Sequence, residues 1–125
     1  MRTTMLLIAI ATGFGILAVA QDDAQYKVWM KSVAASVGAI RKAADSAAAA
    51  PDANTLADTF DKVAEFWKAR NAPDAVQFAE TARDTAKAIA AGNGDKAANL
   101  QKLQAQCGGC HKAHREGTAP NFTIK

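Results

Sequence analysis

The sequence predicts an all-α protein that folds as an antiparallel four-helix bundle. Alanine, the best helix former, supplies 27 of the 105 residues that follow Ala20, and aromatic residues make up only 6% of the chain. Strands favour aromatic and β-branched side chains, which are sparse here. Apolar residues also recur at intervals of three and four in four separate segments, which is the helical period. The chain has 125 residues, of which 50% are hydrophobic, so we expect one domain with one core.

Residues 1–20 have the features of a secretory signal peptide. Arg2 supplies a positive charge, and the apolar run from Leu6 to Val19 has about 14 residues, the length of a signal-peptide core rather than of a membrane span. Ala18-Val19-Ala20 fits the small-residue cleavage pattern. We therefore expect cleavage after Ala20 and a domain at residues 21–125 in the bacterial periplasm, without a membrane span. An uncleaved N-terminal anchor is the alternative.

The first two helices are expected at residues 24–50 and 54–70. Pro51 is expected to end the first helix, and Asp52 or Asn54 to cap the start of the second. The apolar stripe of the first helix contains Tyr26, Met30, Val33, Val37, Ile40 and Ala44. The stripe of the second contains Leu56, Phe60, Val63 and Trp67, and Phe66 widens it.

The third helix is expected to begin at Asn71 as its N-cap, with Pro73 in the first turn, where proline is tolerated. Its stripe contains Ala75, Ala79, Ala82, Ala86 and Ile89, and Gly92-Asn93-Gly94 ends it. The fourth helix is expected from Asp95 to Arg115, followed by a loop after Gly117. Connections this short favour antiparallel neighbours. The alanine-rich stripes predict a thin core that a bulky apolar group could complete.

The last predicted helix carries the motif Cys107-Gly108-Gly109-Cys110-His111, the pattern of covalent haem c attachment. Two cysteines three residues apart share one face of a helix, so both thiols can bond to one edge of a porphyrin. His111 would then ligate the iron. We expect the glycines to leave room where the backbone meets the ring. The expected cofactor is one haem c, with its iron, per chain.

Two other interpretations of the motif remain open. A zinc site could use Cys107, Cys110, His111 and His114, although structural zinc sites usually draw ligands from two segments. A redox disulfide between Cys107 and Cys110 would suit an oxidising compartment, but thioredoxin-like sites follow a strand, and no strand pattern is present.

Met30 is the candidate for the second axial ligand of the iron. It is the single methionine after Ala20, and it lies on the apolar stripe of the first helix. The alternatives are a methionine that only fills the core, which is the commoner role, and an open sixth position. His114 lies on the same side of the ring as His111, so we expect it at the surface or beside a propionate. Arg115 is the first candidate for a propionate contact. Trp29 is expected to cover a haem edge.

With these motifs the chain resembles the class II c-type cytochromes, the family of cytochrome c′ and its low-spin relatives. The resemblance rests on the helix count, on Cys107-Gly108-Gly109-Cys110-His111 near the C-terminus, and on Arg115 after the motif. His114 departs from the family pattern, which has an aromatic residue there. The resemblance implies a four-helix bundle whose first helix supplies the distal residue, and a helix-packed homodimer is compatible with it.

The sequence therefore favours a periplasmic mono-haem cytochrome that carries single electrons between redox partner proteins. The alternative is a five-coordinate protein of the cytochrome c′ type that binds nitric oxide or carbon monoxide, and a third hypothesis is a haem-free dithiol protein. No acid–base pair indicates an enzyme. The net charge of +3 is too small to indicate a nucleic-acid partner.

Overall fold

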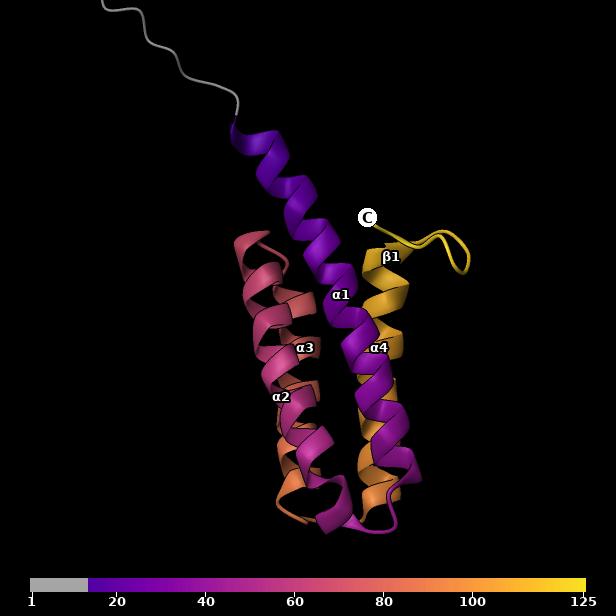
Figure 1. The fold of residues 1–125 in the computed structure, drawn as a ribbon. Coiled ribbons are helices and arrows are strands. Elements are labelled where there is room, and N and C mark those ends of the chain that lie inside the picture. The colour runs from indigo at the N-terminus through magenta and orange to yellow at the C-terminus, as the bar shows by residue number, and fades with distance from the viewer. Residues whose placement is uncertain (1–13) are drawn as a thin grey trace, which may run out of the picture.

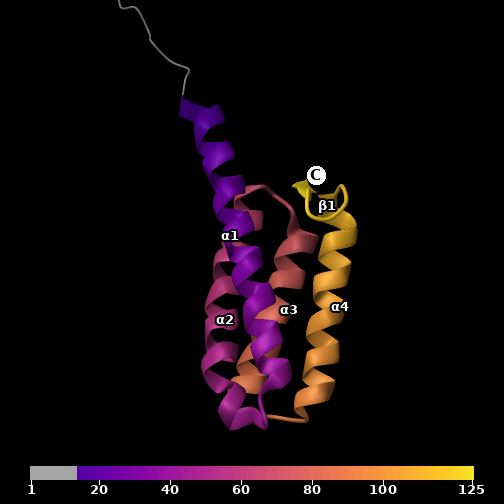
Figure 2. The same cartoon turned by 45° about the vertical axis from the view of Figure 1, so that its right-hand side comes forward.

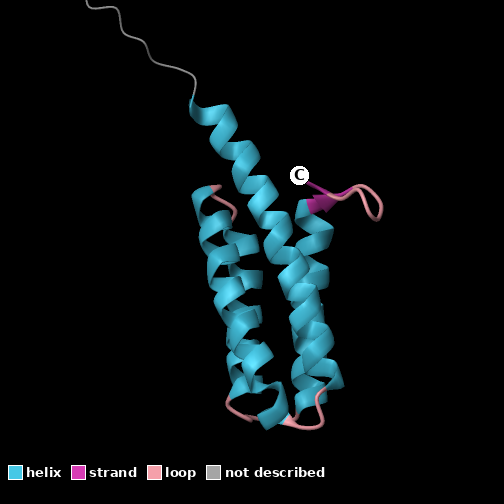
Figure 3. Cartoon of the chain, in the orientation of Figure 1, coloured by secondary structure: helices cyan, strands magenta, loops and turns pink. Residues whose placement is uncertain are grey.

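The computed structural model describes residues 14–125, with their side chains from residue 23 onward. These residues form four helices: α1 (Phe14–Lys42), α2 (Ser46–Ala69), α3 (Pro73–Ala90) and α4 (Lys96–His114). They lie side by side, and each runs in the direction opposite to the helix before it (Figures 1 and 3). The prediction of an all-α bundle of four helices is confirmed.

The helices bury most residues of the stripes that the sequence predicts. The largest fully buried side chains are Ile40, Leu56, Ile89 and Leu103, one from each helix. All five stripe residues of α3 are buried, and four of them are alanines, which lets α3 pack closely against α2. In the first stripe, Ala44 is exposed and lies outside any helix. The packing is unequal, because α2 contacts α1 and α3 along its length whereas α1 hardly approaches α4.

The boundary between the first two helices was predicted wrongly. α1 ends at Lys42, and α2 begins at Ser46, so Pro51 lies inside α2 instead of ending α1. Asp45 caps α2, because its Oδ1 accepts a hydrogen bond of 2.8 Å from the Ala48 amide. Pro51 lacks a backbone N–H, so α2 loses one backbone hydrogen bond there. The alanines around Pro51 have the highest helix propensity, which favours the helix in spite of this loss.

The N-cap assignment of Asn71 was also wrong. Asn71 adopts a left-handed conformation with φ of 55°, and Ala72 stands at the N-cap without a side-chain hydrogen bond. Pro73 is the first residue of α3, as expected. Gly92 and Gly94 have φ of 70° and 77°, so they provide the left-handed turn that was predicted after α3.

The C-terminal residues form a small hairpin instead of the predicted loop. β1 (Arg115–Glu116) pairs antiparallel with β2 (Thr123–Ile124), directly after α4 (Figure 2). The Lys125 amide donates a hydrogen bond to the His114 carbonyl oxygen at 3.1 Å. Strands of two residues are too short to show a periodic pattern, which is why the sequence did not indicate them.

The predicted leader lies partly outside the described residues, which exclude 1–13. α1 begins at Phe14, ten residues before the expected start, and it continues through the expected cleavage point after Ala20. Cleavage there stays a prediction. Among the helices of residues 14–125, none is both long and apolar enough to cross a membrane.

Lys96 joins α4 to the end of α1. Its Nζ donates a hydrogen bond of 3.2 Å to the Ile40 carbonyl oxygen and another to the Ala43 carbonyl oxygen. These carbonyls belong to the C-terminal end of α1, where a cation is favoured by the helix dipole. The contact holds the two helices together at the end where α4 begins.

Replacing Lys96 tests this contact. Lys96→Met keeps the aliphatic stem and removes the donor, so we expect the free energy of unfolding to fall by about 1–2 kcal/mol. Urea unfolding followed by circular dichroism measures it. Lys102→Met, at an exposed position of the same helix, is the control and should change stability by less than about 0.5 kcal/mol. Equal effects of the two substitutions would contradict the contact.

Candidate functional site

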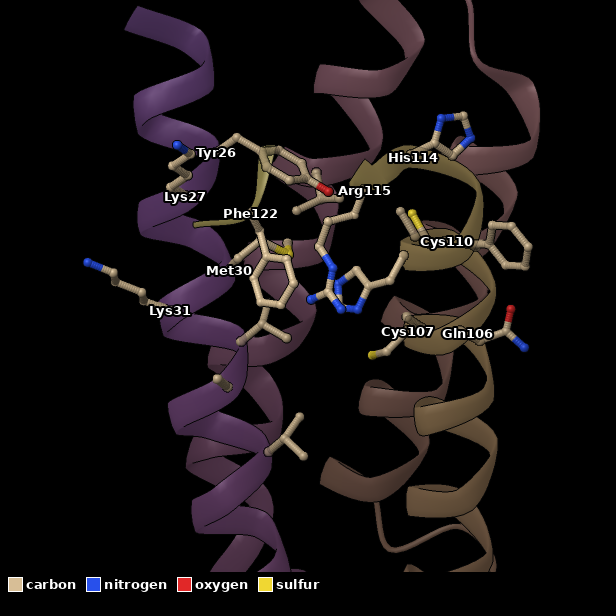
Figure 4. A pocket seen from close by; sticks show the side chains of 18 of the residues that line it. Tyr26, Lys27, Met30, Lys31, Gln106, Cys107, Cys110, His114, Arg115 and Phe122 are labelled. Carbon is tan, nitrogen blue, oxygen red and sulfur yellow. The ribbon is translucent and has the colours of Figure 1, made fainter. Parts of the chain in front are cut away.

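A cavity of about 870 Å³ lies between α1 and α4, where these helices do not pack against each other. α1 forms one wall and α4 the opposite wall, as Figure 4 shows. Apolar side chains of α2 and α3 form the floor: Phe60, Val63, Phe78, Ala79 and Ala82. The C-terminal hairpin, residues 115–125, contributes a further wall. The volume lies in the upper part of the range typical of cofactor sites.

Three residues of the sequence motif line this cavity: Cys107, Cys110 and His111. They lie on the last turns of α4 and are half-buried. The two cysteines are free thiols. Burial raises the pKa of both thiols, that of Cys110 to about 11. Both sulfurs therefore carry protons at neutral pH.

Burial also lowers the pKa of His111, and the nearby charge of Arg115 lowers it further. The imidazole is therefore neutral at pH 7, and a neutral imidazole has the free nitrogen lone pair that a metal ligand needs. Within the described residues, no group of three or more His, Cys, Asp or Glu side chains could hold a metal ion by itself.

Met30 lines the same cavity from α1, across from the helix that carries His111 (Figure 4). It is half-buried and packs against the core at its edge. Met30 and His111 are 81 positions apart in the chain, and the structure places the thioether of one and the imidazole of the other in the lining of the same cavity. Both axial candidates therefore face one space.

The charged side chains around the cavity are all cationic. Lys27, Lys31 and Arg41 come from α1, and Arg115 comes from the end of α4. No aspartate or glutamate is among the described lining residues. Arg115 thus lies beside the cavity. The three cations of α1 could also pair with an anion in the cavity, and they were not among the residues predicted from sequence to do so. A ligand with carboxylate groups and an apolar body fits these walls.

His114 is not at the surface; it lines the cavity at the end of α4, and its place beside a propionate stays a prediction. Its side chain is only 16% exposed, and its Nε2 lies 2.8 Å from Oδ2 of Asp74, in the first turn of α3. Its ring packs on Trp67 of α2, with ring centroids 4.6 Å apart. Trp67 in turn donates a hydrogen bond of 3.1 Å from Nε1 to the hydroxyl oxygen of Tyr26. All four helices are therefore joined beside the motif.

Two further predictions need correction. Trp29 does not line the cavity; it packs edge-on against Tyr26 and Phe66 and borders a shallow groove between α1 and α2. The motif glycines do not line the cavity either. Gly108 faces open space, whereas a Cβ on Gly109 would lie 2.7 Å from the Phe78 ring. Gly109 thus lets α4 approach α3 closely.

Several lining residues were missed by the sequence argument. Phe78 lies outside the predicted stripe of the third helix, and the hairpin residues Asn121, Phe122 and Ile124 fall in the segment predicted as a loop. Phe122 and Ile124 are two alternating apolar residues, which are too few to indicate a strand from sequence.

No protein-family model, no curated protein and no solved structure matches this chain. The function proposed below rests on the residues and geometry of the chain itself.

The two motif glycines provide a matched pair of substitutions. Gly108→Ala should stabilise the protein by about 0.5–1 kcal/mol, because alanine is favoured inside a helix and nothing obstructs it. Gly109→Ala should be less stable than Gly108→Ala by about 1–2 kcal/mol, because the new methyl group displaces the Phe78 ring. Thermal and urea unfolding measure both. Equal stability of the two variants would contradict the close packing at Gly109.

The Asp74–His114 pair predicts a pH dependence of stability. The hydrogen bond from His114 holds the pKa of Asp74 below its ordinary value of 3.8. The Asp74–His114 pair therefore adds to the free energy of unfolding above pH 3.8. This stabilisation is lost as the pH falls through the lower pKa that Asp74 has in the folded state, because Asp74 takes up a proton at higher pH in the unfolded state. Asp74→Asn should make the loss of stability below pH 3.8 shallower. Urea unfolding at a series of acidic pH values measures it, and identical slopes would contradict the prediction.

Proposed function

We propose that this chain is a mono-haem c-type cytochrome of the periplasm that carries single electrons and is not an enzyme. Cys107 and Cys110 would hold the haem, and His111 and Met30 would be the axial ligands of its iron. The observation that carries the proposal is the shared cavity, because the attachment motif of α4 and the thioether of α1 line the same hollow. Redox proteins would be its partners.

The chemistry of the cavity walls fits a haem. The macrocycle is flat and apolar, and the side chains of α2 and α3 at the floor are aromatic and aliphatic. Haem carries two propionates, and the charged lining residues are Lys27, Lys31, Arg41 and Arg115. A carboxylate in this space would meet only cations.

The cysteines would hold the group without consuming an oxidant. Each thiol would add across one vinyl double bond, with the sulfur bonding to one carbon and the hydrogen passing to the other. Their place on one face of α4 directs both sulfurs to the same edge of the ring. When bound, haem supplies an iron that takes up and releases one electron.

The axial candidates suit electron transfer at neutral pH. His111 is uncharged because burial lowers its pKa, so ligation needs no proton release. Met30 carries no charge, and Met/His ligation raises the reduction potential of haem. The apolar floor excludes water and holds few mobile dipoles, so little reorganisation would accompany a change of charge.

The absorption spectrum of the haem-loaded protein tests the proposal. The full chain would be expressed with haem-maturation machinery and then treated with carbon monoxide in the reduced form. A low-spin six-coordinate spectrum that resists carbon monoxide supports electron transfer. Immediate binding to a high-spin ferrous form would favour the five-coordinate gas-binding alternative, and a colourless protein with a Cys107–Cys110 disulfide would refute haem binding.

Substituting Met30 tests its role as a ligand. Met30→Ala should convert the low-spin spectrum to a high-spin one and speed the binding of carbon monoxide, because the sixth position loses its thioether. Val37→Ala removes an apolar side chain from the same wall of the cavity without removing a ligand atom, and it should keep the low-spin spectrum. An unchanged spectrum in Met30→Ala would assign Met30 to the core alone.

A further inference from the structure

The C-terminal hairpin has a fixed structure. Its two strands pair Arg115 with Ile124 and Glu116 with Thr123. Gly117 has φ of 89°, and a Cβ there would lie 2.6 Å from the Asn121 carbonyl oxygen, so the turn requires glycine. The Asn121 amide closes the loop by donating to the Thr118 carbonyl oxygen at 2.7 Å.

The hairpin is also attached to the bundle at both ends. It continues directly from α4, and the Lys125 amide returns to the His114 carbonyl oxygen. Ile124 packs against the core of the bundle and lines the cavity. These contacts attach the hairpin to the end of α4 (Figure 2), with Phe122 and Ile124 half-buried and its other residues exposed.

Phe122 is the aromatic residue that the hairpin brings to the cavity. Its side chain is half-buried, and it lines the same space as Met30 (Figure 4). The guanidinium of Arg115 lies 3.9 Å from the centroid of the Phe122 ring, which fixes the ring by a cation–π contact. Arg115, which lines the cavity beside the motif, therefore also supports this ring.

We propose that the C-terminal hairpin is a permanent wall of the cavity and that Phe122 determines which molecules reach its interior. The ring lets diatomic molecules pass into the cavity more readily than planar molecules of the size of imidazole. The consequence for ligands of iron rests on the proposed function, whereas the wall itself can be tested in the chain without haem.

Reactivity of the two thiols tests the wall in the full chain prepared without haem and kept reduced. Cys107 and Cys110 line the cavity, so a maleimide must enter it to react. Phe122→Ala should raise the rate of modification about tenfold, and Gly117→Val should raise it at least as much, because it breaks the turn. Phe122→Leu should stay near the wild-type rate. Phe78→Ala removes a phenyl ring from the α3 side of the cavity, and its rate of thiol modification should stay within about twofold of the wild-type rate.

Circular dichroism of each variant separates opening of the wall from unfolding of the bundle. Unchanged thiol rates in both Phe122→Ala and Gly117→Val, with native helicity, would overturn the proposal. An equal increase in Phe78→Ala would overturn the role of Phe122, since it would show that any lost ring opens the cavity.

Imidazole binding to the oxidised haem-loaded protein gives the second readout. In a protein that also carries Met30→Ala, and so has no thioether at the sixth position, Phe122→Ala should bind imidazole about tenfold more tightly than the same protein with Phe122, while the association rate of carbon monoxide changes by less than about threefold. A haem-loaded protein in which both quantities stay unchanged would refute the size selection. A chain that never acquires haem would refute the proposed function, and the thiol rates would still decide whether the hairpin is a wall.

Discussion

Helices α1 and α4 are joined at one end and separated along much of their length, and the site depends on this separation. At the joined end, Lys96 donates hydrogen bonds from α4 to the last carbonyls of α1. Beyond it the two helices do not pack against each other, and the space between them is the cavity. α1 is held in place through α2 instead, by the buried aromatic contacts of Tyr26 with Phe66 and Trp67.

The separation gives each wall a different chemistry. α4 presents two thiols and an imidazole, α1 presents a thioether and three cations, and α2 and α3 present an apolar floor. The Asp74–His114 pair and the packing of Gly109 on Phe78 attach the motif turn to α3. His114 and Phe78 also line the cavity, so the residues that support the motif turn and His111 are themselves part of the cavity wall.

The helices could be predicted from sequence because their apolar stripes are long and regular. The boundary near Asp45 could not, because the alanines on both sides suit a helix equally well. The break depends on the side chain of Asp45 and on Lys96, which comes from α4, more than 50 residues away. A proline is a weaker signal than a cap when it falls near the start of a helix.

Only part of the candidate site could be predicted from sequence, because the rest depends on contacts between residues that are distant in the chain. The attachment motif is local in sequence, so its residues could be named. That Met30 faces the same space depends on how α1 lies against α2, and the sequence provided only its position on the stripe. Trp29 was misplaced because its partner Phe66 comes from another helix. The burial of His114 was not predicted either, because its partner Asp74 comes from α3. The hairpin was missed because pairing of two-residue strands is decided by the turn at Gly117 and by contact with the bundle.

We propose that the cavity between α1 and α4 holds one haem bound to both cysteines. Mass spectrometry of the protein purified from cells with haem-maturation machinery tests this most directly, on the intact chain and on its tryptic peptides. We expect one haem per chain, carried by the peptide that contains both Cys107 and Cys110. A peptide that carries two free thiols or a disulfide, with no haem on the chain, would contradict it.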